Sequence, residues 1–210
     1  MKKLFLILLF VPVVFSCSKD DNSSPVYLDD NGVTIKCPDA NVGDKGTVNE
    51  KEYTVVDEAK LRDMVSKDED VTCVCTSKVT DMTGKDDGFG FITSSFNQEI
   101  GNWDTSNVTN MRRMFSGANI FNQDIGNWDI SKVTDMSWMF NQAFRFNKDI
   151  GNWDTSNVIN MIGMFNYAIS FNQNLKKWCV IKIISEQTGF GFYSKLTEVN
   201  EPVWGTCPND

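Results

Sequence analysis

Three aspartates recur at one position of a repeating sequence, and their spacing is the first pattern that could support chemistry. Asp104, Asp129 and Asp154 lie 25 residues apart. If successive copies stack about 5 Å apart, as neighbouring strands do, these carboxylates repel one another. We expect each carboxylate to accept backbone N–H groups of the turn that follows it, which would offset the repulsion. The alternative is a calcium ion between copies, with Asn107 and its equivalents nearby; we otherwise expect no metal site.

Histidine is absent from the 210 residues, and this narrows the catalytic classes open to the chain. Its absence removes the usual general base of serine and cysteine nucleophiles and the commonest metal ligand. The Gly-x-Gly runs at 88–90 and 189–191 lack the further residues of a phosphate-binding loop. We therefore expect no enzyme, no catalytic residue and no cofactor. A glycoside hydrolase that uses paired acids remains an alternative.

Five of the six cysteines could form disulfides, and the sixth, Cys17, has a different role. Cys179 and Cys207 bracket the C-terminal segment, so we expect them to pair with each other. Cys37 is expected to pair with Cys73 or Cys75, which leaves one thiol free. The two alternatives stay open because residues i and i+2 of a strand point to the same face.

The N-terminus predicts secretion and lipidation. Two lysines precede an apolar run over 4–15, which is the pattern of a signal peptide and is too short for a transmembrane helix. The run ends at Val14-Phe15-Ser16-Cys17, which resembles a bacterial lipobox, and the next residues, 18–21, resemble the surface-export signal of Bacteroidetes lipoproteins. We expect a signal peptide over 1–16, an acylated Cys17 and a flexible tether over 17–25. The protein would then be an outer-membrane lipoprotein facing the cell exterior.

The charge balance is acidic. The chain has 20 lysines and arginines against 28 acidic residues, and removal of the signal peptide takes away Lys2 and Lys3. The mature net charge is therefore about −10, which disfavours nucleic acid as a partner.

A repeat of 25 residues positions these groups. Phe96-Asn97-Gln98-Glu99-Ile100-Gly101-Asn102-Trp103-Asp104 recurs at 121–129 and 146–154, and a weaker copy covers 171–178. A fixed period of this length predicts stacked coils, because one coil cannot bury its apolar side alone.

Within each copy the apolar spacing changes. Ile100, Trp103 and Thr105 surround a short extended run, whereas Val108, Met111 and their successors follow the spacing of one helical face. The predicted fold is an α/β solenoid, leucine-rich-repeat-like, in which each coil is a short parallel strand plus a short helix. We expect coils over 71–178, an N-terminal cap over 26–70 with a hairpin at 46–56 and a helix at 57–66, and a C-terminal cap over 179–210.

The repeat also resembles a known group of surface proteins. Its Phe-Asn-Gln-Asp-Ile-Gly-Asn-Trp-Asp motif and the following Thr-Ser-Asn-Val-Thr-Asn-Met are similar to BspA-like leucine-rich-repeat proteins, and more closely to the 25-residue-repeat lipoproteins of flavobacteria and mycoplasmas. The resemblance implies a surface-anchored adhesion or protein-interaction module. Its partner would be a host, matrix or neighbouring-cell protein.

Two sets of residues could provide the contact surface. The repeated tryptophans, Trp103, Trp128, Trp153 and Trp178, are expected in the core; exposed, they would form a ladder for glycans. Glycan binding is therefore the alternative function. Positions that change between copies are better contact candidates, because packing does not dictate them: Arg112, Arg113, Trp138, Phe144, Arg145, Ile162 and Tyr167.

Overall fold

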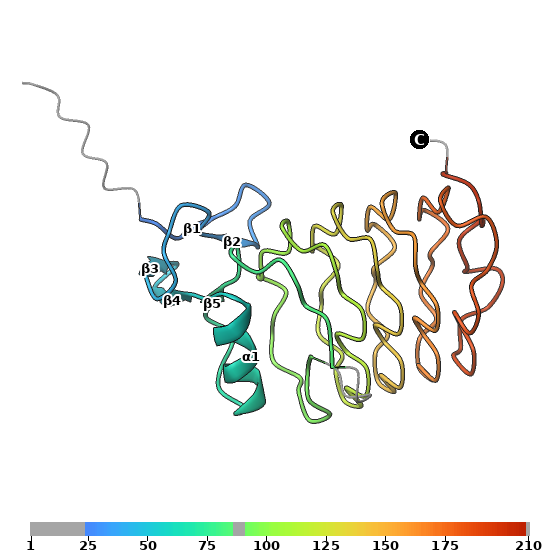
Figure 1. Cartoon of the computed structure of the whole chain (residues 1–210), viewed down its shortest axis with the longest axis horizontal. Helices are drawn as coiled ribbons and strands as arrows, with labels where there is room; N and C mark the ends of the chain where they lie inside the picture. Colours follow the sequence, from blue (N-terminus) through green and yellow to red (C-terminus); the bar gives the residue numbers. More distant parts are fainter. Residues whose placement is uncertain (1–23, 86–90, 209–210) are drawn as a thin grey trace, which may run out of the picture.

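The structure, a computed structural model, describes residues 24–85 and 91–208. It is an elongated stack of coils with two small sheets and one helix at its N-terminal end (Figure 1). The predicted signal peptide and Cys17 lie outside the described residues. In the described ranges, no helix is long and apolar enough to cross a membrane.

Two small sheets form the N-terminal unit. β1 (Tyr27–Leu28) pairs antiparallel with β2 (Ile35–Lys36). β3 (Lys45–Val48) and β4 (Lys51–Val55) form the hairpin expected at 46–56, and β5 (Val74–Cys75) pairs parallel with β4. The two hairpin-turn residues have positive φ angles, 49° at Asn49 and 66° at Glu50, as a two-residue hairpin turn requires.

One helix, α1 (Glu58–Ser66), packs this unit against the first coil. The Asp57 side chain accepts the N–H of Lys60 and caps the helix N-terminus. Leu61 and Val65 face the core, where they are almost completely buried.

The core of the stack is built from columns of aromatic rings. Phe115, Phe140 and Phe165 stack with ring centroids 5.4 and 5.6 Å apart. A second column comprises Phe96, Phe121, Phe146 and Phe171. Every ring in both columns is at most 2 % exposed, so each coil buries its apolar side against its neighbours.

The prediction of a helix in each coil is wrong. α1 is the only helix among the described residues, and successive β-turns occupy the stretch from Met111 to Ala118. Arg113 and Gly117 have φ angles of 59° and 78°, which a right-handed helix excludes. The N–H of Met114 donates within the coil to Met111, whereas the N–H of Phe115 donates to Met139 of the next coil at 2.9 Å. The apolar spacing was typical of a helix, but these residues use alternate N–H groups to join coils. The strand predicted around Ile100 to Thr105 of each regular coil is also wrong, since no strand forms there; isolated parallel bridges between coils lie instead in the segment predicted as helix, as between Asn110 and Asp135.

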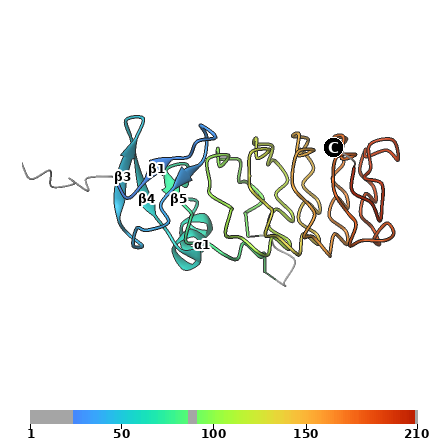
Figure 2. The ribbon, with the colours of Figure 1, turned by 90° about the horizontal axis from the view of Figure 1, so that it is seen from above.

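The segment expected as a C-terminal cap continues the stack as a divergent coil. Gly163, Phe165 and Tyr167 donate their N–H groups to carbonyl oxygens of Thr188, Phe190 and Phe192 at 3.1, 2.8 and 2.7 Å. The red coil consequently forms the far end of the molecule (Figures 1 and 2). Its offset from the preceding coil is one residue longer than the regular repeat, which hides it from a search at fixed period.

Candidate functional site

The tryptophan column is buried, as the sequence predicts. Trp103, Trp128, Trp153 and Trp178 are each at most 3 % exposed. Each indole N–H donates to a backbone carbonyl of the preceding coil, for example Trp128 Nε1 to Ile100 O at 3.1 Å. These rings therefore hold coils together and present no face to a sugar.

The repeated aspartates cap turns, as expected. One carboxylate oxygen of Asp129 accepts the N–H of Ser131 at 3.0 Å, and Asp154 accepts that of Ser156 at the same distance. Burial opposes ionisation of Asp129, but the Ser131 hydroxyl and N–H hold the pKa of its carboxyl below the usual value. The calcium alternative gains no support from the described parts of the chain, where no group of three or more acidic, cysteine or histidine side chains could hold a metal ion.

Asp104 differs from its equivalents because it is 3 % exposed. Its carboxylate accepts the N–H of Ser106 at 3.1 Å and the hydroxyl of Ser77 at 2.5 Å. The ammonium group of Lys36 lies 3.9 Å from it. These contacts join the first regular coil to the N-terminal unit.

Two disulfides lie at the two ends of the described chain. Cys37 pairs with Cys75, and Cys179 pairs with Cys207. Cys73 is the free cysteine of the described residues and is half-buried. The structure thus selects between the two partners that the sequence left open for Cys37.

The predicted contact residues differ in exposure. Ile162 and Tyr167 are 37 % and 42 % exposed, and Arg145 is also exposed, whereas Phe144 and the two arginines at 112 and 113 are partly buried. Trp138 packs its ring over Gly163, where an added Cβ would lie only 2.6 Å from the ring. Trp138 is therefore in part a packing residue.

Sequence analysis missed the main exposed aromatic cluster. Tyr167, Phe192 and Tyr193 lie together on the last two coils, and we call them the aromatic shelf. The ring centroids of Tyr167 and Tyr193 are 4.6 Å apart, and those of Phe192 and Tyr193 are 4.0 Å apart. Phe192 and Tyr193 are 56 % and 58 % exposed. The shared residue type of Tyr167 and Tyr193, 26 positions apart, is the signal that could have found the cluster.

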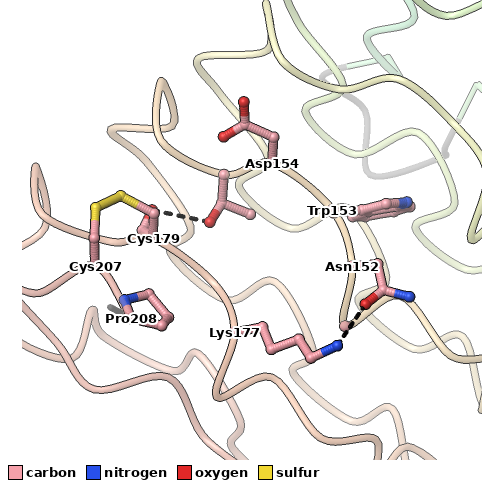
Figure 3. A pocket seen from close by; sticks show the side chains of 9 residues that line it. Asn152, Trp153, Asp154, Lys177, Cys179, Cys207 and Pro208 are labelled. Atoms are coloured by element: carbon pink, nitrogen blue, oxygen red, sulfur yellow. Dashed lines mark hydrogen bonds between the residues drawn. A yellow bond between two sulfur atoms is a disulfide. The ribbon is translucent and has the colours of Figure 1, made fainter. Parts of the chain in front are cut away.

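A polar hollow of about 580 Å³ lies beside the second disulfide (Figure 3). Lys177 extends across it and donates to the Asn152 side-chain oxygen at 3.0 Å. Asp154 and Pro208 line the hollow as well, and the disulfide sulfurs border it. An amide, an ammonium group and a carboxylate around one hollow could bind a polar ligand rich in hydroxyl groups.

The stacked coils with a buried aromatic ladder define a repeat protein, and the sequence comparison places it in a family. The family described as "Mycoplasma protein of unknown function, DUF285" matches residues 83–201, more than half of the chain. The chain belongs to this family, whose matched range includes most of the divergent last coil. Comparisons with curated proteins and with solved structures find no match.

Proposed function

We propose that this protein is a surface-anchored lipoprotein that binds another protein through the C-terminal end of its stack. The observation that carries the proposal is the aromatic shelf, where three exposed aromatic side chains pack against one another beside a buried aromatic core. Clustered exposed aromatics are uncommon on soluble surfaces and are typical of interface centres. Ile162 and Ile169, 37 % and 49 % exposed, add apolar surface on the preceding coil.

The N-terminal sequence and the resemblance to BspA-like proteins support the cellular setting. The lipobox at Cys17 would attach the chain to the outer membrane through acyl groups, with the tether before β1 leading to the stack. The aromatic shelf lies at the opposite end of the molecule from β1 (Figure 2), so an anchored stack would hold it away from the membrane. The expected partner is a host, matrix or neighbouring-cell protein.

Binding by cells that carry the full chain tests this function. Cells are applied to arrays of extracellular matrix and cell-surface proteins, with Phe192→Ser as the shelf variant. Val42→Ser is the control, because Val42 is 49 % exposed but lies in the N-terminal unit. We expect one class of protein to retain cells, and retention to fall about tenfold with Phe192→Ser only, as loss of a hot-spot aromatic predicts. The proposal would be contradicted if no arrayed protein retained the cells, or if cells with either variant were retained equally.

Glycan binding at the polar hollow is a second candidate, which the side chains around Asn152 favour. The test is a glycan array with the full chain and Asn152→Ala, and with Asn127→Ala as the variant at the equivalent position of the preceding coil. Binding that Asn152→Ala abolishes and Asn127→Ala retains would support the hollow. Glycan binding that neither variant changes would exclude the hollow as the binding site.

A further inference from the structure

Two successive coils carry the same pair of polar side chains, an aspartate and an asparagine three residues apart. Asp124 and Asn127 form this pair in one coil, and Asp149 and Asn152 form it in the next. The two members of the first pair line a hollow of about 560 Å³, and those of the second pair line a hollow of about 200 Å³. The stack therefore repeats one polar pair from coil to coil, beside a hollow each time.

A tight turn fixes the aspartate of each pair. One carboxylate oxygen of Asp124 accepts the N–H of Gly126 at 3.0 Å, and Asp149 makes the equivalent contact in the next coil. Gly126 also lets the coils approach closely, because a Cβ added there would lie 2.7 Å from the carbonyl oxygen of Asp149. The Phe121 and Phe146 rings of the same two coils have centroids 5.8 Å apart, which indicates the spacing of the two pairs.

The turns use only part of the hydrogen-bonding capacity of each pair. A carboxylate has two oxygens, and in each aspartate only one of them accepts a hydrogen bond from the described residues. The side-chain amide nitrogens of Asn127 and Asn152 have no acceptor in the described ranges 24–85 and 91–208. Each pair consequently keeps an acceptor on one side chain and donors on the other.

The row of pairs has a different contact at each end. Lys177 follows Asn152 in the next coil and donates to its side-chain oxygen at 3.0 Å (Figure 3). At the other end, the amide of Asn102 donates to the carbonyl oxygen of Thr72 at 3.0 Å, so it joins the stack to the N-terminal unit. The available groups thus span three coils. We call them the polar strip: Asp124, Asn127, Asp149, Asn152 and Lys177.

Neighbouring hydroxyl groups match the chemistry of each pair. A hydroxyl group both donates and accepts, so one hydroxyl can donate to the free carboxylate oxygen while its neighbour accepts from the amide. Sugars carry such neighbouring hydroxyls, and successive rings of an extended glycan repeat at a length comparable to the spacing of the coils. The polar strip has two carboxylates and one ammonium group, so it disfavours an anionic glycan.

We propose that the polar strip binds an unbranched, neutral oligosaccharide that lies along the stack, with one sugar unit at each coil. The amides of Asn127 and Asn152 donate to one hydroxyl of a sugar unit, and the aspartate of the same pair accepts from the next hydroxyl. Tyr53 of β4 lines the hollow around Asn127 and adds an aromatic wall at that end. The inference rests on glycan binding at the hollow beside Lys177, the second candidate function, and names the class of glycan and its direction.

Affinity as a function of glycan length tests the inference. The full chain in detergent is titrated with β-1,4-linked oligomers of glucose, mannose, xylose or N-acetylglucosamine, from one to six units long. In at least one series we expect the six-unit glycan to bind about tenfold more tightly than the two-unit glycan. Asn127→Ala should remove this gain and leave the affinity for the two-unit glycan unchanged, because the hollow beside Lys177 is intact.

Two further variants separate recognition from folding. Asp124→Asn should also remove the gain, although it retains the turn: Asn174, at the equivalent position two coils later, accepts the N–H of Lys176 at 3.0 Å. Thr134→Ala changes an exposed residue of the same coil outside the strip and should keep the full gain.

The outcomes distinguish this inference from the glycan site on which it rests. Equal affinity for two-unit and six-unit glycans in every series, or a gain that Asn127→Ala retains, overturns binding along the stack and leaves the hollow beside Lys177 as a site for short glycans. Absence of binding at every length overturns both. The aromatic shelf and its protein partner are unaffected by either result.

Discussion

The guanidinium group of Arg62 donates to the carbonyl oxygen of Thr83 at 2.8 Å, and this contact ends the ladder of hydrogen bonds between coils. The same guanidinium carbon lies 4.6 Å from the centre of the Phe91 ring, which fixes its orientation. One side chain of α1 therefore satisfies backbone acceptors whose equivalents in the regular coils, such as the carbonyls of Asp135 and Ser137, accept backbone N–H groups. Terminal coils of repeat proteins need such a cap because nothing stacks beyond them.

Replacing Arg62 should destabilise the stack from its N-terminal end. Arg62→Met keeps most of the apolar stem but leaves the carbonyls of Asp81 and Thr83 without their donor. The expected loss in free energy of unfolding is about 1–2 kcal/mol, measured by urea denaturation. Lys60→Met, an exposed position on the same helix, is the control and should cost less than about 0.5 kcal/mol. Equal losses for the two variants would mean that the guanidinium group does not cap the ladder.

The indole N–H groups predict a second stability effect. Trp128→Phe retains an aromatic ring in the column but removes the donor to the carbonyl oxygen of Ile100, 3.1 Å away. A buried acceptor without a donor costs about 1–3 kcal/mol, and the smaller ring adds to that loss. Trp138→Phe is the matched control, because Trp138 is partly exposed and its indole N–H has no acceptor among the described residues. In urea denaturation, Trp128→Phe should lose more free energy of unfolding than Trp138→Phe. The reverse order would contradict the role of the indole N–H in joining coils.

The sequence predicts the stack and its core but not the backbone within each coil. The recurrence of Phe, Trp and Met every 25 residues identifies the buried columns, because burial depends on side-chain type and period. The apolar spacing of Val108, Met111 and Phe115 also fits a helix, since i, i+3 and i+7 positions meet on one helical face. Positive φ angles at Arg113 and Trp138, which decide against a helix, belong to residue types that give no local signal for them.

The aromatic shelf was harder to predict than the core because one of its coils does not keep the 25-residue period. Tyr167 varies between copies, which marks it as a contact candidate, but Phe192 and Tyr193 lie in a coil whose one-residue insertion breaks the period. Their contact with Tyr167 depends on continuing the ladder into that coil, as the bond from Tyr167 N to Phe192 O does.

The close approach of neighbouring coils predicts that position 126 requires glycine. A Cβ added there would lie 2.7 Å from the carbonyl oxygen of Asp149, which is backbone and cannot move without shifting the next coil. Gly126→Ala should therefore cost at least about 2 kcal/mol, by analogy with overpacked cores. Gly117→Ala is the control: no atom lies within 4 Å of its added Cβ, so only its left-handed φ of 78° opposes the change, at about 1 kcal/mol. If thermal unfolding shows that Gly117→Ala destabilises the protein more than Gly126→Ala, the close approach of the coils at Gly126 is contradicted.

The two carboxyl groups with opposite pKa shifts predict opposite pH effects. Burial raises the pKa of Glu201, and Glu186 and Glu198 add to the shift, so ionisation there disfavours the folded state. Stability from this group is present at acidic pH and declines as the pH rises from about 4.5 through the higher folded-state pKa. Glu201→Gln should therefore be more stable than the natural chain at pH 7, and the difference should vanish as the pH falls below 4.5. The melting temperatures of the two proteins, measured at pH 7 and at several values down to below 4.5, give this difference directly.

Glu58 provides the matched control with the opposite sign. Burial opposes its ionisation, but the hydroxyl and N–H of Thr80 donate to its carboxylate at 2.7 and 3.0 Å and hold its pKa below the usual value. Its contribution is present above about pH 4.5 and is lost as the pH falls through the lower folded-state pKa. Glu58→Gln should therefore be less stable than the natural chain at pH 7, with the deficit shrinking on acidification. A shift of the melting temperature in the same direction for both variants at pH 7 would contradict the opposite pKa shifts of Glu201 and Glu58.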